Sequence, residues 1–96
     1  IPRGLKQLIA YDQKKNSGYA GLLRTYLDKE RNIAETIRAA YIHRNTFLYR
    51  LQRIQDILQM DLDNPDVRLT LQLAFRIIDA VKPPAPGQSD GESASL

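Results

Sequence analysis

The residues best suited to chemistry lie between Tyr41 and Leu58, in the stretch YIHRNTFLYRLQRIQDIL. This stretch holds the only histidine of the chain and three arginines, together with Asn45, Thr46 and Tyr49. Arginine and asparagine make the bidentate hydrogen bonds that read guanine and adenine, and arginine also binds phosphate. The stretch is therefore either a core helix with a polar outer face or a helix that binds something negatively charged.

Catalytic and metal-binding patterns are missing from the sequence. His43 has no second histidine and no cysteine with which to form a zinc site. No G-x-S-x-G, no phosphate-binding glycine loop and no H-E-x-x-H is present. Asp61, Asp63 and Asp66 are spaced loosely like a calcium loop, but the glycine and the closing glutamate are missing, which favours capping and solvated roles in a turn. We therefore expect that this chain is not an enzyme and that it binds no metal, cofactor or small-molecule ligand.

The distribution of charge says more than its total. The formal net charge of +3 and the pI of about 9.4 are weak indications of a polyanionic partner. Residues 36–55, however, contain four arginines and no acid, whereas residues 56–66 contain four acids and no base. The positive charge is thus concentrated on the stretch that carries the polar contact residues.

Length and composition set the class of protein. Ninety-six residues predict one domain. No apolar run reaches the 18 or so residues of a membrane span, and no signal-peptide pattern opens the chain. The absence of cysteine fits a reducing compartment. Because the first residue is Ile1 and not methionine, we expect the chain to be a piece of a longer protein.

Apolar residues recur at helical spacing through most of the chain, and no strand pattern is convincing. The sequence therefore predicts an all-α fold, a compact bundle of about five helices. The break NSG at residues 16–18 offers Asn16 or Ser17 as a cap for the second helix. The expected helices cover about residues 4–15, 19–29, 32–40, 44–59 and 65–80.

The third and fourth helices have the layout of a helix-turn-helix, over about residues 32–59. Asn32 and Glu35 form the pattern of a capping box, and the third helix is about eight residues long. After a three-residue turn, His43 is the expected N-cap of the fourth helix, with a ring nitrogen accepting from a backbone N–H. In such a motif the second helix enters the major groove of DNA, and its first residues reach the base edges.

The fourth helix has two distinct faces. Its predicted core stripe is Phe47, Leu51, Ile54 and Leu58, and the opposite face carries Asn45, Tyr49, Gln52 and Asp56. Phosphate or base contacts are expected from His43, Arg44, Asn45, Thr46, Tyr49, Arg50 and Arg53. The alternative is a helical protein-interaction module that turns this basic face to an acidic partner protein, without preference for duplex DNA.

The last helix and the C-terminal residues complete the prediction. Asn64 is the expected N-cap of this helix, and its main apolar stripe is Val67, Leu71, Ala74 and Ile78. Leu69 and Leu73 form a second stripe on nearly the opposite side, so the helix is either sandwiched centrally or has a face for another chain. Residues 82–96 are rich in proline, glycine and serine, which predicts a disordered tail after a helical domain at residues 1–81.

The stretch NIAETIRAAYIHRNTFLYRLQRIQDILQMDLDNPDVRLTLQLAFRII resembles the C-terminal helix-turn-helix domain of the PucR/CdaR-type bacterial transcription regulators. Its sharpest part, HRNTFLYRLQRI, is close to a family signature H-R-N-T-L-x-Y-R-L-x-x-I. The resemblance covers about residues 5–80. It implies a cytoplasmic domain that binds double-stranded DNA, follows N-terminal sensory domains and commonly regulates catabolic operons, with the recognition helix beginning at Arg44.

Two further expectations follow from this motif. Helix-turn-helix units usually bind DNA in pairs, which predicts a homodimer of the full-length protein, and Leu69 and Leu73 are the possible dimer contact. Tyr41 occupies a turn position where other such motifs prefer glycine. A positive φ at Tyr41 would therefore be strained.

Overall fold

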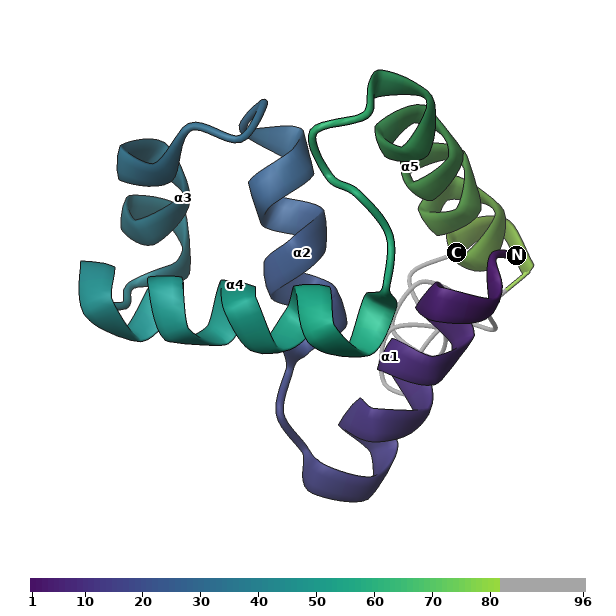
Figure 1. Ribbon diagram of the computed structural model, residues 1–96, viewed down its shortest axis with the longest axis horizontal. Coiled ribbons are helices and arrows are strands. Elements are labelled where there is room, and N and C mark those ends of the chain that lie inside the picture. Colours follow the sequence, from purple (N-terminus) through teal and green to yellow (C-terminus); the bar gives the residue numbers. More distant parts are fainter. Residues whose placement is uncertain (82–96) are drawn as a thin grey trace, which may run out of the picture.

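The computed structural model describes residues 1–81, and the predicted tail at residues 82–96 lies outside the described residues. The described chain is all-α, as predicted, and its helix ends agree with the predicted ones to about one residue (Figure 1). Even the longest helix of residues 1–81, with 17 residues, lacks the length and apolar content of a membrane crossing. The helices are α1 (Arg3–Lys15), α2 (Tyr19–Asp28), α3 (Ile33–Ala40), α4 (Arg44–Leu58) and α5 (Pro65–Val81).

The second helix is the element around which the others pack. Half of its ten residues are buried, and it contacts each of the other four helices. The fourth helix crosses beneath α2 and α3 and also contacts α1, so three helices hold it in place (Figure 1). Burial of apolar surface drives this arrangement. The core side chains are Leu5, Leu8, Tyr19, Leu22, Leu23, Tyr26, Leu27, Phe47, Ile54, Leu58, Leu62, Leu71, Ala74 and Phe75.

A glycine lets α1 approach the end of α4. Gly4 is buried, and a Cβ atom built on it would lie 2.0 Å from the backbone oxygen of Leu58. Only a residue without a side chain fits this contact. The neighbouring Leu5 and Leu8 are fully buried in the core. The C-terminal half of α4 is therefore fixed by a close backbone contact as well as by apolar packing.

The N-terminus of α2 is capped from the preceding helix. The backbone N–H groups of Tyr19 and Ala20 each donate to a carboxylate oxygen of Asp12, at 2.8 Å, and the Ser17 hydroxyl donates to the same group. The prediction that Asn16 or Ser17 caps α2 is therefore wrong. Asn16 instead ends α1 in the left-handed conformation, where asparagine is tolerated (φ 54°).

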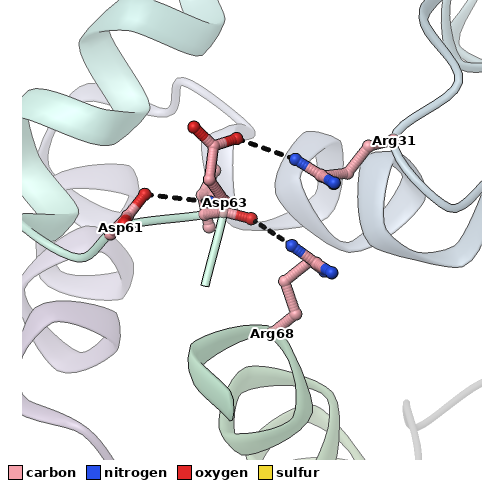
Figure 2. A network of polar contacts seen from close by, with 5 residues as sticks. Arg31, Asp61, Asp63 and Arg68 are labelled. Atoms are coloured by element: carbon pink, nitrogen blue, oxygen red, sulfur yellow. Dashed lines mark hydrogen bonds and ion pairs between the residues drawn. The ribbon is translucent and has the colours of Figure 1, made fainter. Parts of the chain in front are cut away.

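The connection between α4 and α5 is held by two arginines (Figure 2). Arg31 forms an ion pair with Asp63 at 2.8 Å, and Arg68 donates to the carbonyl oxygen of the buried Leu62 at 2.9 Å. Asp61 accepts the backbone N–H of Asp63 within the turn. These acids serve the turn between helices, as the sequence predicted. The connection thereby ties the corner before α3 to the start of α5.

The last helix is capped as predicted and packs through one face only. The Asn64 side chain accepts the backbone N–H of Asp66 at 2.8 Å. Leu71 and Ala74 are buried as expected. Phe75 is also buried, under the guanidinium of Arg24, although the predicted core stripe omitted it. The main core stripe is otherwise partly confirmed, because Val67 and Ile78 are half-buried.

The second apolar stripe of α5 is not covered by the rest of residues 1–81. The exposed fractions of Leu69, Leu73 and Ile77 are 56%, 52% and 54%. Their spacing of four residues places them on one side of the helix. Within residues 1–81, α5 is therefore not sandwiched centrally, and the face that carries Leu69 and Leu73 has no cover.

A buried tyrosine gives the stability of the fold a pH dependence. Tyr26 packs against the ring of Phe47, and burial raises the pKa of its hydroxyl above the ordinary value of about 10. This contribution to stability is complete below the unfolded pKa and is lost as pH rises through the folded pKa, because only the unfolded chain ionises readily. Urea unfolding between about pH 8 and pH 11.5 should show a decline that is shallower in Tyr26→Phe. Parallel declines would contradict this role of Tyr26.

Candidate nucleic-acid interface

The third and fourth helices form the predicted helix-turn-helix. The eight residues of α3 are followed by the three residues 41–43 and then by the 15 residues of α4. The Asn32 side chain accepts the backbone N–H of Glu35 at 2.9 Å, which is one half of the predicted capping box. The N–H of Asn32 instead donates to the carbonyl oxygen of Lys29, so the box has no free donor for its other half.

The turn between the two helices contains a strained residue. Tyr41 ends α3 with φ 56° and ψ 45°, and its N–H donates to the carbonyl oxygen of Ile37. The next N–H, of Ile42, donates to the same oxygen at 3.2 Å. The left-handed conformation costs a residue with a side chain about 1–2 kcal/mol. Tyr41 therefore has the positive φ at which we expected it to be strained. Tyr41 is also 93% exposed.

His43 lies at the N-cap of α4, but its ring does not cap the helix. Its backbone is extended (φ −74°, ψ 153°), and its carbonyl oxygen accepts the N–H of Phe47. The predicted hydrogen bond from a backbone N–H to the ring is absent, so that prediction is wrong. The favoured caps carry an oxygen on a short side chain that folds back over the first turn. The larger imidazole ring is exposed instead.

The N-terminus of α4 is consequently free to bind an anion. Within residues 1–81, α2, α3 and α5 are capped by Asp12, Asn32 and Asn64, whereas α1 and α4 have neither a side-chain cap nor an acid in the first turn. The first N–H groups of a helix carry partial positive charge and lack partners within the helix. A phosphate is a suitable partner for such a terminus.

The two faces of α4 lie as predicted. Phe47, Ile54 and Leu58 are buried in the core, and Leu51 is half-buried. On the other side, the contact candidates with uncharged side chains are open to solvent to different degrees. Asn45 and Tyr49 are exposed, and Thr46 is half-buried. Further along the same face, the Gln52 amide donates to the Asp56 carboxylate at 3.0 Å.

The arginines around the start of α4 have no acidic partner within residues 1–81. The two ion pairs of this part of the chain use Arg24 with Asp79 and Arg31 with Asp63. Arg44 is exposed, and Arg50 is half-buried in a shallow depression beside the N-terminus of α2 and the end of α3. Their charges are therefore available to an external anion.

Arg53 differs from the other predicted contact arginines, because α1 holds it. Its guanidinium donates to the Tyr11 hydroxyl at 3.1 Å and lies 5.7 Å from the centre of the Tyr11 ring. The Tyr11 ring also stacks on Tyr19, with ring centres 5.5 Å apart. Arg53 therefore fixes α1 against α4. Because a guanidinium has five N–H donors, others remain for a phosphate.

Two exposed residues near the start of α4 were not among the predicted contacts. Arg38 lies on α3, and Tyr41 lies in the turn. The acid-free stretch in the sequence already included Arg38, so its charge was a usable signal. Tyr41 gave a weaker one, since the exposure of an aromatic side chain in a turn cannot be read from spacing.

Comparison with known proteins agrees with this geometry. The family described as the PucR C-terminal helix-turn-helix domain matches residues 19–77. The purine catabolism regulatory protein of Bacillus subtilis is 34% identical over 71 residues, which are 74% of this chain. The DNA-binding transcriptional activator AdeR of the same organism is 30% identical over 76% of the chain. The carbohydrate diacid regulator of Escherichia coli is 48% identical over 44% of the chain.

These matches concern one domain of larger proteins. The matched parts make up 13%, 17% and 11% of the three relatives. No solved structure gave a significant match. The family match covers well over half of the chain and includes the whole of α2, α3 and α4. The chain therefore belongs to the family of PucR C-terminal helix-turn-helix domains.

Proposed function

We propose that this domain is a binding module and not an enzyme, and that it binds double-stranded DNA sequence-specifically with α4 in the major groove. The observation that carries the proposal is the uncapped N-terminus of α4, which combines free backbone donors with unpaired arginines. The helix-turn-helix layout gives the docking mode. The printed name of the relative AdeR, a DNA-binding transcriptional activator, supports the same role.

The predicted contact residues take different roles in this proposal. Asn45, Thr46 and Tyr49 face the base edges, where the Asn45 amide is suited to adenine. Arg44 and Arg50 bind phosphate or guanine. Arg53 fixes α4 to α1 and uses its remaining N–H donors to bind phosphate. The exposed ring of His43 adds a contact to the DNA backbone at the start of the helix.

We further propose that the longer protein is a bacterial transcription regulator of catabolic genes that acts in the cytoplasm. Two relatives that share this domain are named for purine catabolism and for carbohydrate diacids. The domain would be the output part of that protein, with its effector bound elsewhere.

An NMR titration of the isotope-labelled chain with a mixed-sequence duplex tests the DNA proposal. Non-specific binding, with Kd of about 10⁻⁴ to 10⁻⁶ M, suffices to shift peaks and needs no operator. We expect shifts concentrated on residues 43–53 that fade between low and moderate salt. If heparin and an acidic protein shifted these peaks as strongly as the duplex at equal charge, the interaction module would replace the DNA-binding function.

The exposed stripe of α5 is our proposed homodimer contact. A helix-turn-helix usually binds paired half-sites, and Leu69 and Leu73 are more than half exposed. Sedimentation velocity should show association of the wild-type chain at about millimolar concentration. The double variant Leu69→Glu with Leu73→Glu should stay monomeric, because burying a charge in an apolar interface is unfavourable. Its helical circular dichroism should be unchanged.

A matched control adds two acids elsewhere. Gln7→Glu with Gln13→Glu changes exposed positions of α1 by the same charge and should associate like the wild type. A wild-type chain that stays monomeric, or a leucine variant that associates normally, would contradict this placement of the dimer contact.

A further inference from the structure

Tyr41 combines two features that do not stabilise the domain. Its backbone is in the left-handed region, which disfavours residues with a side chain, and 93% of its side chain is exposed. Within residues 1–81 the ring has no stacking partner and its hydroxyl has no hydrogen bond. No other large apolar or aromatic side chain of the described chain is as exposed; the next, Val81, reaches 73%.

Besides Tyr41 and one glycine, the residues of the described chain with positive φ all carry polar side chains: Asn16, Glu30, Arg31 and Gln59. Asn16 belongs to a residue type that tolerates the left-handed region, and Arg31 pairs with Asp63. Gln59 ends α4 with φ 53° and ψ 40°, nearly the conformation of Tyr41, but carries a polar side chain that solvent accommodates. Tyrosine at the end of α3 therefore points to a function outside the packing of this chain.

The position of Tyr41 suggests what its side chain meets. It lies three residues before Arg44, beside the exposed His43 and the uncapped N-terminus of α4. A DNA strand whose phosphates bind this terminus would pass close to the turn. Tyrosine hydroxyls are among the groups that donate hydrogen bonds to DNA phosphates. The ring would lie against the adjoining deoxyribose.

We infer that Tyr41 is a DNA-backbone contact residue, whose hydroxyl donates to a phosphate at the edge of the groove that α4 enters. This inference rests on the proposed function and adds a residue to its binding surface. Because tyrosine is neutral, its contact releases no counterion, unlike the contacts of the arginines. Because phosphate contacts carry no sequence information, the contact strengthens binding to any duplex.

Two substitutions test the inference by effects of opposite sign. Tyr41→Gly relieves the backbone and should raise the Tm by about 4–8 °C, while weakening binding about tenfold. Tyr41→Phe keeps the backbone preference and should weaken binding about fivefold, the value of one hydrogen bond. Fluorescence anisotropy with two unrelated duplexes of about 20 base pairs measures the DNA affinity of both variants. The dependence of that affinity on salt should not change.

Gln59→Gly is the matched control, since it relieves the same conformation at the far end of α4. It should raise the Tm without changing the affinity for either duplex. If Tyr41→Gly and Tyr41→Phe bind like the wild type while Arg44→Ala binds weakly, the inference is overturned and the proposed function stands. If Arg44→Ala also binds like the wild type, both are overturned.

Discussion

Replacing Gly4 with alanine should destabilise the fold by about 3 kcal/mol, the upper part of the range for overpacked positions. The added Cβ would lie 2.0 Å from the backbone oxygen of Leu58, and a backbone atom cannot rotate away as a side chain can. Helix α1 must therefore move off the end of α4, which opens the packing of Leu5 and Leu8. Urea unfolding followed by circular dichroism measures the change.

The sign of this effect distinguishes the close contact from helix propensity. Alanine is the better helix former by about 0.5–1 kcal/mol, so propensity alone would stabilise the variant. Gly21→Ala provides the control, because a Cβ there has nothing within 4 Å and the position is exposed in α2. Gly21→Ala should stabilise the fold by about 0.5–1 kcal/mol. A Gly4→Ala variant as stable as Gly21→Ala would show that α1 does not need the contact.

The helices of this domain were predictable because their signals are local. Asn32 and Asn64 cap the helices that follow them, as their positions in the sequence indicated. The cap of α2 was not predictable in this way. Asp12 lies seven residues before Tyr19, and it reaches that N–H only because the chain reverses between α1 and α2. Gly4 likewise gave no local signal, since its partner Leu58 lies on another helix.

The candidate site was predictable to the extent that one helix defines it. Periodicity placed Asn45 and Tyr49 opposite the core, and the structure leaves both exposed. Periodicity could not show that Arg53 meets Tyr11, which is 42 residues away in the chain. The missing cap at His43, by contrast, agrees with its residue type, because histidine is not among the favoured N-cap residues.

Several departures from maximal stability coincide in residues 41–44. Tyr41 is in a strained conformation, the helix after His43 has no side-chain cap, and Arg44 has no acidic partner in the described chain. Such departures tend to cluster at functional sites. α1 also begins without a side-chain cap, so it is the combination with the strained Tyr41 and the unpaired Arg44 that distinguishes the start of α4. In our proposal, a DNA phosphate completes the start of α4 and offsets this local cost.

Neutralising two arginines in the first half of α4 should produce the largest loss of DNA affinity. Arg44→Ala with Arg50→Ala removes two phosphate contacts in our proposal. Each contact is worth about tenfold at roughly 50 mM salt, so the double variant should bind a mixed-sequence duplex about a hundredfold more weakly. The slope of log affinity against log salt should fall in magnitude by about 1.8, because two fewer counterions are released. Fluorescence anisotropy across a salt series measures both quantities.

The control removes equal charge from another part of the surface. Arg3 and Lys6 are exposed at the start of α1, where Gly4 lies against the far end of α4, and Arg3→Ala with Lys6→Ala gives the same net charge. If affinity depended only on net charge, both double variants would lose it equally, and the assignment of α4 as the reader would fail. A loss confined to the α4 variant, with unchanged helical circular dichroism, requires that the phosphates lie against the start of that helix.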